Sequence, residues 1–142
     1  MKKSLSIFLL ILMFVLSACG AASGTKTLVN EDENTTVKVS YKGDTITAIE
    51  TLYTESFSDL DLTSEEEAQE LIDMMGDMAQ SEEGIEMSFA IEDESIVTTI
   101  KMDIAKLAES DSKILKDFYL DADNLSLKEF EKSMKEEGYT VK

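Results

Sequence analysis

The residue best suited to covalent chemistry is Cys19, the one cysteine in a chain of 142 residues. It directly follows the small residues Ser17 and Ala18, which end a long apolar run. A cysteine thiolate is nucleophilic enough to take up a diacylglyceryl group as a thioether, and small residues before it can unwind into the site of a peptidase. This arrangement predicts that the chain is cleaved before Cys19 and that the thiol carries lipid.

Residues 1–18 have the composition of a signal peptide rather than of a folded segment. Lys2 and Lys3 give a positively charged start, and residues 5–16 are apolar except for Ser6. This run is too short to span a bilayer, which takes about 20 residues, but it suits a signal peptide. The ending LSACG at residues 16–20 resembles the lipobox of bacterial lipoproteins. The alternative is a signal anchor with an incidental cysteine.

The lipobox predicts both the organisation of the chain and its location. We expect residues 1–18 to be removed, residues 19–24 to form the lipidated cysteine and a short tether, and residues 25–142 to fold as one domain. Two or three acyl chains, such as palmitate, anchor a protein stably because each buried CH₂ contributes about 0.8 kcal/mol. The protein is therefore expected at the cell membrane, lipid-anchored and facing outside the cytoplasm. Basic residues that are all Lys, and Gly20 after the cysteine, favour a Gram-positive cell surface.

The charge of the chain excludes several classes of function. Thirty Asp and Glu stand against 13 Lys, with no Arg and no His, for a formal net charge of −17. Nucleic acid is not expected as a partner, because phosphate binding needs clustered cations. The lack of His removes the commonest general base and metal ligand, and acylation would consume the one thiol. We therefore expect a protein that is not an enzyme and has no cofactor and no metal site.

Two acidic features offer competing hypotheses. Asp121, Asp123 and Asn124 begin like the calcium loop of an EF-hand. However, Ser126 stands where that loop needs Gly, and Lys132 stands where it needs a bidentate glutamate. Helix capping and solvation explain these acids better. Paired carboxylates for glycoside hydrolysis stay open, because 30 acids provide many pairs and no cleft signal selects one.

The most distinctive local motif is the polar turn formed by Tyr41, Lys42, Gly43 and Asp44. As a functional hypothesis, Lys42 and Asp44 form a recognition pair at the tip of a hairpin. As a structural hypothesis, these are the residues that a tight turn requires, since Gly adopts a positive φ without strain. We favour the structural hypothesis and keep recognition as the alternative.

Period-two alternation of apolar and polar residues predicts the strands. The phase of the alternation changes near residues 48–50, which predicts a β-bulge or a bend of the strand there. Such alternation favours an antiparallel sheet with one face toward water. The expected strands are residues 25–30, residues 37–41, a strand beginning at Thr45, and a hairpin of residues 85–92 and 96–104.

Helical periodicity predicts two long helices and one short one. Residues 64–80 begin with a capping box, and a second capping box at Ser126 begins a helix that ends before Gly138. A short helix is expected around residues 114–118, and residues 139–142 suit a short terminal strand. The order is then roughly β-β-β-α-β-β-(α)-α. This predicts an α+β domain in which an antiparallel sheet of about four to five strands carries helices on one face.

The order of these motifs resembles the YehR-like family of small bacterial lipoproteins, a family without an established activity. The resemblance implies an α+β domain with an antiparallel sheet covered by helices, and it brings no catalytic or binding residues with it. The matching stretches are SYKGD at 40–44, TSEEEAQELI at 63–72, EGIEMSFAIED at 83–93, VTTIKMDIAKL at 97–107 and KEFEKSMKEEGYTVK at 128–142.

The hypothesis that fits these observations is a membrane-anchored lipoprotein that acts as a non-catalytic binding or accessory module. Its partners are the membrane, through the N-terminal lipid, and an envelope protein, peptide or small ligand whose identity the sequence leaves open. Two alternatives remain. One is an envelope-associated enzyme that uses carboxylates only, and the other is a protein that captures cations on its acidic surface.

Overall fold

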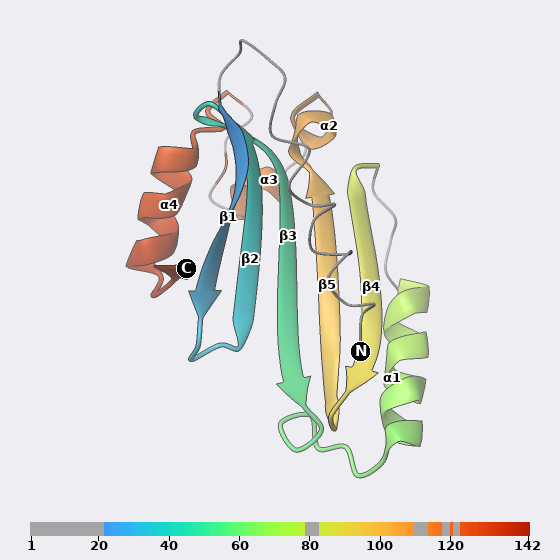
Figure 1. Cartoon of the computed structure of the whole chain (residues 1–142). Coiled ribbons are helices and arrows are strands. Elements are labelled where there is room, and N and C mark those ends of the chain that lie inside the picture. Colours follow the sequence, from blue (N-terminus) through green and yellow to red (C-terminus); the bar gives the residue numbers. More distant parts are fainter. Residues whose placement is uncertain (1–21, 79–82, 110–113, 118–119, 121–122) are drawn as a thin grey trace, which may run out of the picture.

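Six strands form one antiparallel sheet in the order β4-β5-β3-β2-β1-β6 (Figure 1). The structure is a computed structural model and describes residues 22–78, 83–109, 114–117, 120 and 123–142. The strands are β1 (Ser23–Asn30), β2 (Thr35–Lys42), β3 (Thr45–Ser56), β4 (Ile85–Glu92), β5 (Ser95–Asp103) and β6 (Thr140–Val141). The helices are α1 (Glu65–Met78), α2 (Ile104–Glu109), α3 (Ile114–Asp117) and α4 (Leu127–Glu136).

The predicted α+β class and antiparallel sheet are confirmed. The sheet has six strands rather than four to five because the terminal segment adds β6 at the edge of β1. This is the short terminal strand expected within residues 139–142. At the other end of the domain, Ser23 and Gly24 were expected in the tether. They are the first residues of β1 and pair with Lys42 and Tyr41.

A β-bulge interrupts β3 one residue before the predicted region. Ser40 pairs with Ala48 and Tyr41 pairs with Ile46, so Thr47 is the extra residue on β3. Ile46 and Ile49 lie three positions apart, which in a regular strand would put them on opposite faces. The bulge lets both side chains enter the core, where each is 1% exposed.

The core lies between one face of the sheet and the helices α2, α3 and α4. Its buried side chains come from strands β1, β2, β3 and β5, from these three helices, and from Leu120. They are Leu28, Val37, Val39, Ile46, Ile49, Met102, Ile104, Leu107, Leu115, Leu120, Leu127, Phe130 and Met134. Helix α1 lies beside β4 at the edge of the sheet (Figure 1).

Both predicted capping boxes begin helices. The hydroxyl of Ser126 accepts a hydrogen bond from the N–H of Glu129 at the start of α4, and Ser64 accepts one from Glu67 at the start of α1. Gly138 has a φ of 92° and ends α4, as predicted. The predicted helix at residues 64–80 is observed as α1 to Met78, and residues 79–80 lie outside the described residues.

Helix α2 was not predicted. Ile104 was expected as the last residue of a strand, but β5 ends at Asp103 and Ile104 begins a helix. The reason is a cap, because the carboxylate of Asp103 accepts a hydrogen bond from the N–H of Lys106 at 3.2 Å. The short helix predicted around residues 114–118 is observed as α3, and residue 118 lies outside the described residues.

Candidate functional site

The face of the sheet turned away from α2, α3 and α4 is polar, and no helix of the described ranges lies over it (Figure 1). The pairing registers place five of its side chains in one row, which we call the charged row. From β1 to β4 the row consists of Thr27, Lys38, Glu50, Lys101 and Glu86. Four residues of alternating charge therefore stand side by side on neighbouring strands, about 4.8 Å apart.

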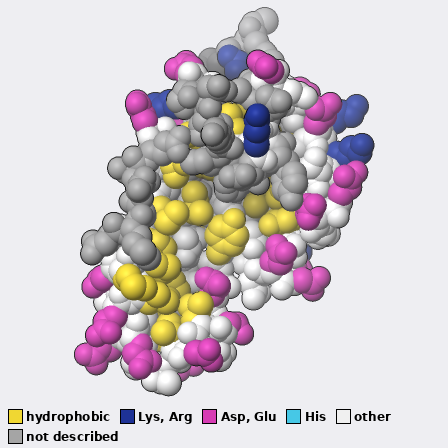
Figure 2. Space-filling view, turned by 180° about the vertical axis from the view of Figure 1, so that it is seen from behind, with side chains coloured by type: hydrophobic (Ala, Val, Ile, Leu, Met, Phe, Trp, Pro, Cys, Tyr) yellow, Lys and Arg dark blue, Asp and Glu magenta, His cyan; other side chains and the backbone are white. Residues whose placement is uncertain are grey.

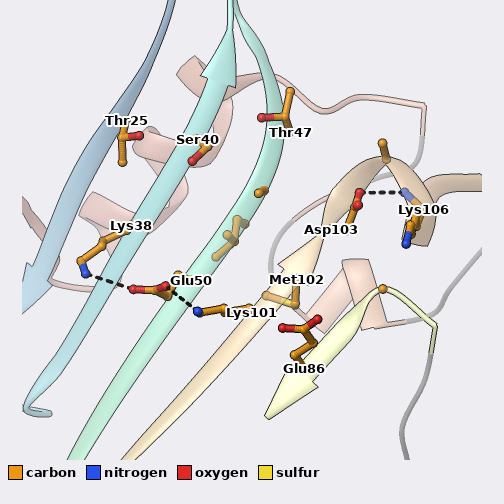
Figure 3. Close-up of a pocket in the computed structure, with 14 residues that line it drawn as sticks. Thr25, Lys38, Ser40, Thr47, Glu50, Glu86, Lys101, Met102, Asp103 and Lys106 are labelled. Atoms are coloured by element: carbon orange, nitrogen blue, oxygen red, sulfur yellow. Dashed lines mark hydrogen bonds and ion pairs between the residues drawn. The ribbon is translucent and has the colours of Figure 1, made fainter. Parts of the chain in front are cut away.

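Glu50 is the centre of this row. Its carboxylate accepts a hydrogen bond from Lys38 Nζ at 3.0 Å, and Lys101 Nζ lies 3.8 Å from its other oxygen (Figure 3). The Glu50 side chain is 29% exposed, whereas the Lys38 and Lys101 side chains are 46% and 58% exposed. Exposed ion pairs contribute little stability, typically 0–1 kcal/mol. The row therefore leaves two accessible ammonium groups on an open surface.

A hollow of about 630 Å³ lies over the charged row at the end of the sheet near α2 (Figure 3). Hydroxyl groups of Thr25, Ser40 and Thr47 line it on one side, and Asp103 and Lys106 line it on the other. Hydroxyls both donate and accept hydrogen bonds. Together with the charged row, these groups offer partners for donors, acceptors and charges of either sign on a ligand.

Local backbone features shape the rim of the hollow. The bulge at Thr47 twists β3 at this point, since bulges increase the local twist of a strand. Gly84, just before β4, has a φ of 96°. A Cβ atom at Gly84 would lie 3.2 Å from Cβ of Lys106. The glycine therefore allows the start of β4 to approach α2 closely.

The hollow differs in charge from the rest of the chain. Residues 43–100 contain 17 acidic residues and no Lys. The lining of the hollow contains three Lys and three acidic side chains, so its formal charge balances in a protein of net charge −17. A polar ligand that carries negative as well as positive charges is therefore repelled less at the hollow than at the acidic surface elsewhere on the protein.

The sequence placed Lys38 and Lys101 on the polar side of their strands but singled out neither of them. They meet at Glu50 because β3 lies between β2 and β5 in the sheet. Glu50 and Lys101 are separated by a helix and a hairpin strand, and no local pattern specifies their register. Their polar positions in alternating strands were the only available signal.

The predicted turn at residues 41–44 is confirmed as a turn, with Gly43 at a φ of 64°. The carboxylate of Asp44 accepts hydrogen bonds from the hydroxyl of Ser126 at 2.7 Å and from the N–H of Lys128 at 3.0 Å. These two bonds, the hydroxyl first, lower the pKa of Asp44. Asp44 therefore holds the start of α4 against the turn. Lys42 is exposed, and a recognition role for this turn stays a prediction.

Two other sequence hypotheses depend on residues for which the structure gives no placement. Cys19 lies outside the described residues, as does Asp121 of the acidic stretch. The amide of Asn124 donates to the carboxylate of Glu129 in the first turn of α4. In the part of the chain that the structure describes, no group of three or more His, Cys, Asp or Glu side chains is arranged to hold a metal. None of the described helices is long and apolar enough to cross a membrane.

The protein family to which the chain belongs follows from a match to a family model. Residues 24–140 match the family described as "Protein of unknown function (DUF1307)". The chain belongs to the DUF1307 family. The match spans all four helices and strands β2 to β5 completely, together with all but one residue each of β1 and β6, and it covers every residue that lines the hollow.

Curated relatives and a solved structure agree with this family. The "Uncharacterized lipoprotein Lin0239" of Listeria innocua is 27% identical over 97% of this chain and 94% of its own length. The "Uncharacterized lipoprotein Lmo0207" of Listeria monocytogenes is 26% identical with the same coverage. The NMR structure of the Escherichia coli YehR protein has a TM-score of 0.60 at 18% identity and covers 86% of this chain and 92% of YehR. The YehR-like resemblance predicted from the sequence is therefore confirmed, and the fold is shared.

Proposed function

We propose that this DUF1307 protein is a lipid-anchored binding module that faces outside the cytoplasm. In this proposal Cys19 carries the membrane anchor, and the charged row with its hollow receives an envelope protein or peptide. The observation that carries the proposal is the open polar face, which is hollowed to about 630 Å³ and lined by hydroxyls and by charges of both signs. The lipobox and the lipoprotein names of both Listeria relatives support the anchor.

Binding fits the charged row better than catalysis does. A carboxylate that acts as a general acid needs a raised pKa, which burial or a neighbouring like charge supplies. Glu50 instead lies between two ammonium groups at 3.0 and 3.8 Å. Its carboxylate is therefore held by two ion pairs, and the chain contains no His to act in its place. We therefore propose a partner that is bound without being transformed.

The spacing of the row indicates the kind of partner. Its side chains repeat at the distance between strands, about 4.8 Å, and alternate in charge. An extended polar peptide segment with both charge signs can place opposite charges over Lys38, Glu50 and Lys101 in turn. Electrostatic complementarity of this kind fixes the register of a partner and disfavours wrong ones.

Site-specific photo-crosslinking in the producing cells tests this proposal. Benzoylphenylalanine is placed at Thr36 or Thr99, which lie in the row next to the charged row on the open face. The matched control carries it at Lys132 on α4, where the side chain is 79% exposed. We expect one protein adduct of the same mass from both open-face positions and none of that mass from Lys132.

A charge reversal makes the test specific for the charged row. The double variant Lys38→Glu and Lys101→Glu should lose the adduct while its circular dichroism spectrum still shows the folded sheet, although the like charges beside Glu50 lower its thermal midpoint. Adducts that form equally from Lys132, or that survive the charge reversal, would contradict binding at this face. A hydrolytic activity in the purified protein that one carboxylate substitution abolishes would contradict the non-catalytic assignment.

A further inference from the structure

The folded domain begins almost directly after the predicted lipid anchor. The carbonyl oxygen of Ala22 accepts a hydrogen bond from the N–H of Gly43 at 2.7 Å, and Ser23 is paired with Lys42 as the first residue of β1. Only residues 20 and 21 stand between Cys19 and this first contact. Ala22 is therefore held to the β2–β3 turn, whatever path the two intervening residues take.

Covalent geometry limits how far this point can be from the anchor. Three Cα-to-Cα steps join Cys19 to Ala22, so the two Cα atoms are at most about 11 Å apart. Strand β3 starts beside the same turn and has 12 residues. At about 3.3 Å per residue it extends roughly 36 Å away from the turn. The anchor therefore fixes one end of the sheet at the lipid surface and leaves the other end free to stand away from it.

The β2–β3 turn and the β4–β5 turn lie at opposite ends of the sheet (Figure 1). We call the end with the β2–β3 turn and the first turn of α4 the anchored end. It includes Lys42, Asp44 and Lys128. We call the opposite end, where β3 leads into α1 and where β4 turns into β5, the far end. It includes the first turn of α1, with Glu65, Glu66 and Glu67, and the turn residues Asp93 and Glu94.

Charge is distributed unevenly between these ends. The far end is built from residues 55–67 and 91–96, which contain nine acidic residues and no Lys. In the view of Figure 2, Asp and Glu side chains gather at the lower end of the molecule, which is the far end. Most Lys side chains in that view lie in the upper half. An anionic lipid surface attracts exposed Lys and repels carboxylates within about one Debye length, roughly 8 Å at physiological salt.

We propose that the domain stands end-on at the membrane, with the β2–β3 turn and the start of α4 against the lipid headgroups and the acidic far end pointing away. The inference rests on the proposed anchor at Cys19 and extends it from an attachment point to an orientation. The charged row then faces sideways, where a partner can reach it parallel to the membrane. The turn at residues 41–44 lies at the lipid surface, so a soluble protein partner has little access to it.

Single-cysteine labelling of the lipidated protein tests this orientation. Acylation occupies the only native thiol, so Lys42→Cys at the anchored end and Glu66→Cys at the far end each give one reactive position. Each variant is labelled with maleimide-polyethylene glycol in vesicles of phosphatidylglycerol and phosphatidylethanolamine and again in detergent. We expect the vesicle-to-detergent ratio of labelling rates to fall at least about fivefold below unity for position 42 and to stay within about twofold of unity for position 66. Position 42 is paired with Ser23, directly after the residue that lies within about 11 Å of the anchor, whereas position 66 lies at the far end.

Two controls make the result decisive. Ten Gly and Ser residues inserted between residues 21 and 22 should restore labelling at position 42, since a flexible chain of that length reaches about 17 Å or more. Acylation of every variant is followed separately with an alkyne fatty acid. Equal rate ratios at positions 42 and 66 in acylated protein would overturn the end-on orientation alone. Loss of acylated product from the parent chain would overturn the anchor and, with it, this inference.

Discussion

Thr51 provides the sharpest test of how the sheet is packed. This residue lies in the middle of β3, is 1% exposed, and has its hydroxyl oxygen buried without a hydrogen-bond partner among the residues that the structure describes. The registers explain why, because Thr51 stands between Val37 on β2 and Ile100 on β5, both of them apolar. We predict that Thr51→Val stabilises the protein.

The magnitude follows from the cost of burying an unpaired hydroxyl. Protein mutational data place that cost at about 1–3 kcal/mol, and Val has nearly the same shape and a similar preference for strands. We therefore expect the free energy of unfolding to rise by about 1–2 kcal/mol. With a urea m-value of about 2 kcal/mol/M, the midpoint of unfolding should rise by about 0.5–1 M.

Thr35 is a matched control on the neighbouring strand. It is 2% exposed, but its hydroxyl donates a hydrogen bond to the carbonyl oxygen of Glu33 at 3.0 Å. Thr35→Val should therefore destabilise the protein by about 0.5–1.5 kcal/mol. Both variants are measured by urea denaturation of the non-acylated domain that begins at Ala22. A Thr51→Val variant that is neutral, or that loses as much stability as Thr35→Val, would refute the reasoning.

Three further predictions concern the anchor, the cap of α4 and the core. Cys19→Ala should lose acyl labelling and leave the membrane fraction, and a variant that stays acylated would contradict the lipobox prediction. Hydrogen bonds lower the pKa of Asp44 in the folded protein. The stability that its carboxylate contributes is therefore present above the unfolded-state pKa, about 3.9, and is lost as the pH falls through the lower folded-state pKa. Asp44→Asn should thus lower the urea midpoint at pH 7 and bring the variant closer to the parent at pH 3; an equal difference at both pH values would contradict this. Phe130→Ala should cost about 3–5 kcal/mol, because Phe130 is 2% exposed in the core, whereas Lys132→Ala on the same helix should leave the urea midpoint nearly unchanged.

Local patterns predicted most of the elements. Alternation placed Val37 and Val39 in the core and Lys38 on the polar face, as observed. The cap at Ser126 and the left-handed Gly138 set the limits of α4 within the residues predicted. These patterns can be interpreted from the sequence because they involve residues only a few positions apart. Over that range the period of a strand or helix fixes which side chains face the same way.

The sequence pattern was less informative where the local backbone conformation depends on residues that are distant in sequence. Ile46 and Ile49 indicated a bulge, but its position at Thr47 depends on how β2 pairs with β3. Asp103 falls inside the strand predicted at residues 96–104, and its role as the cap of α2 depends on where β5 ends. Residues 139–142 suited a short terminal strand, but its place at the edge of the sheet depends on pairing with β1, which no local pattern specifies.

The sequence by itself determined the predicted cellular location and the class of fold. The lipobox around Cys19 is contiguous, and the alternation and caps are local, so no tertiary information is needed to read them. Only the tertiary structure decided which polar residues come together as the candidate site. Lys38, Glu50 and Lys101 meet because β3 lies between β2 and β5, and Ala22 meets Gly43 because β1 pairs with β2. Both contacts join residues far apart in sequence, and the burial of the common core selects such pairings over every other register that the chain could adopt.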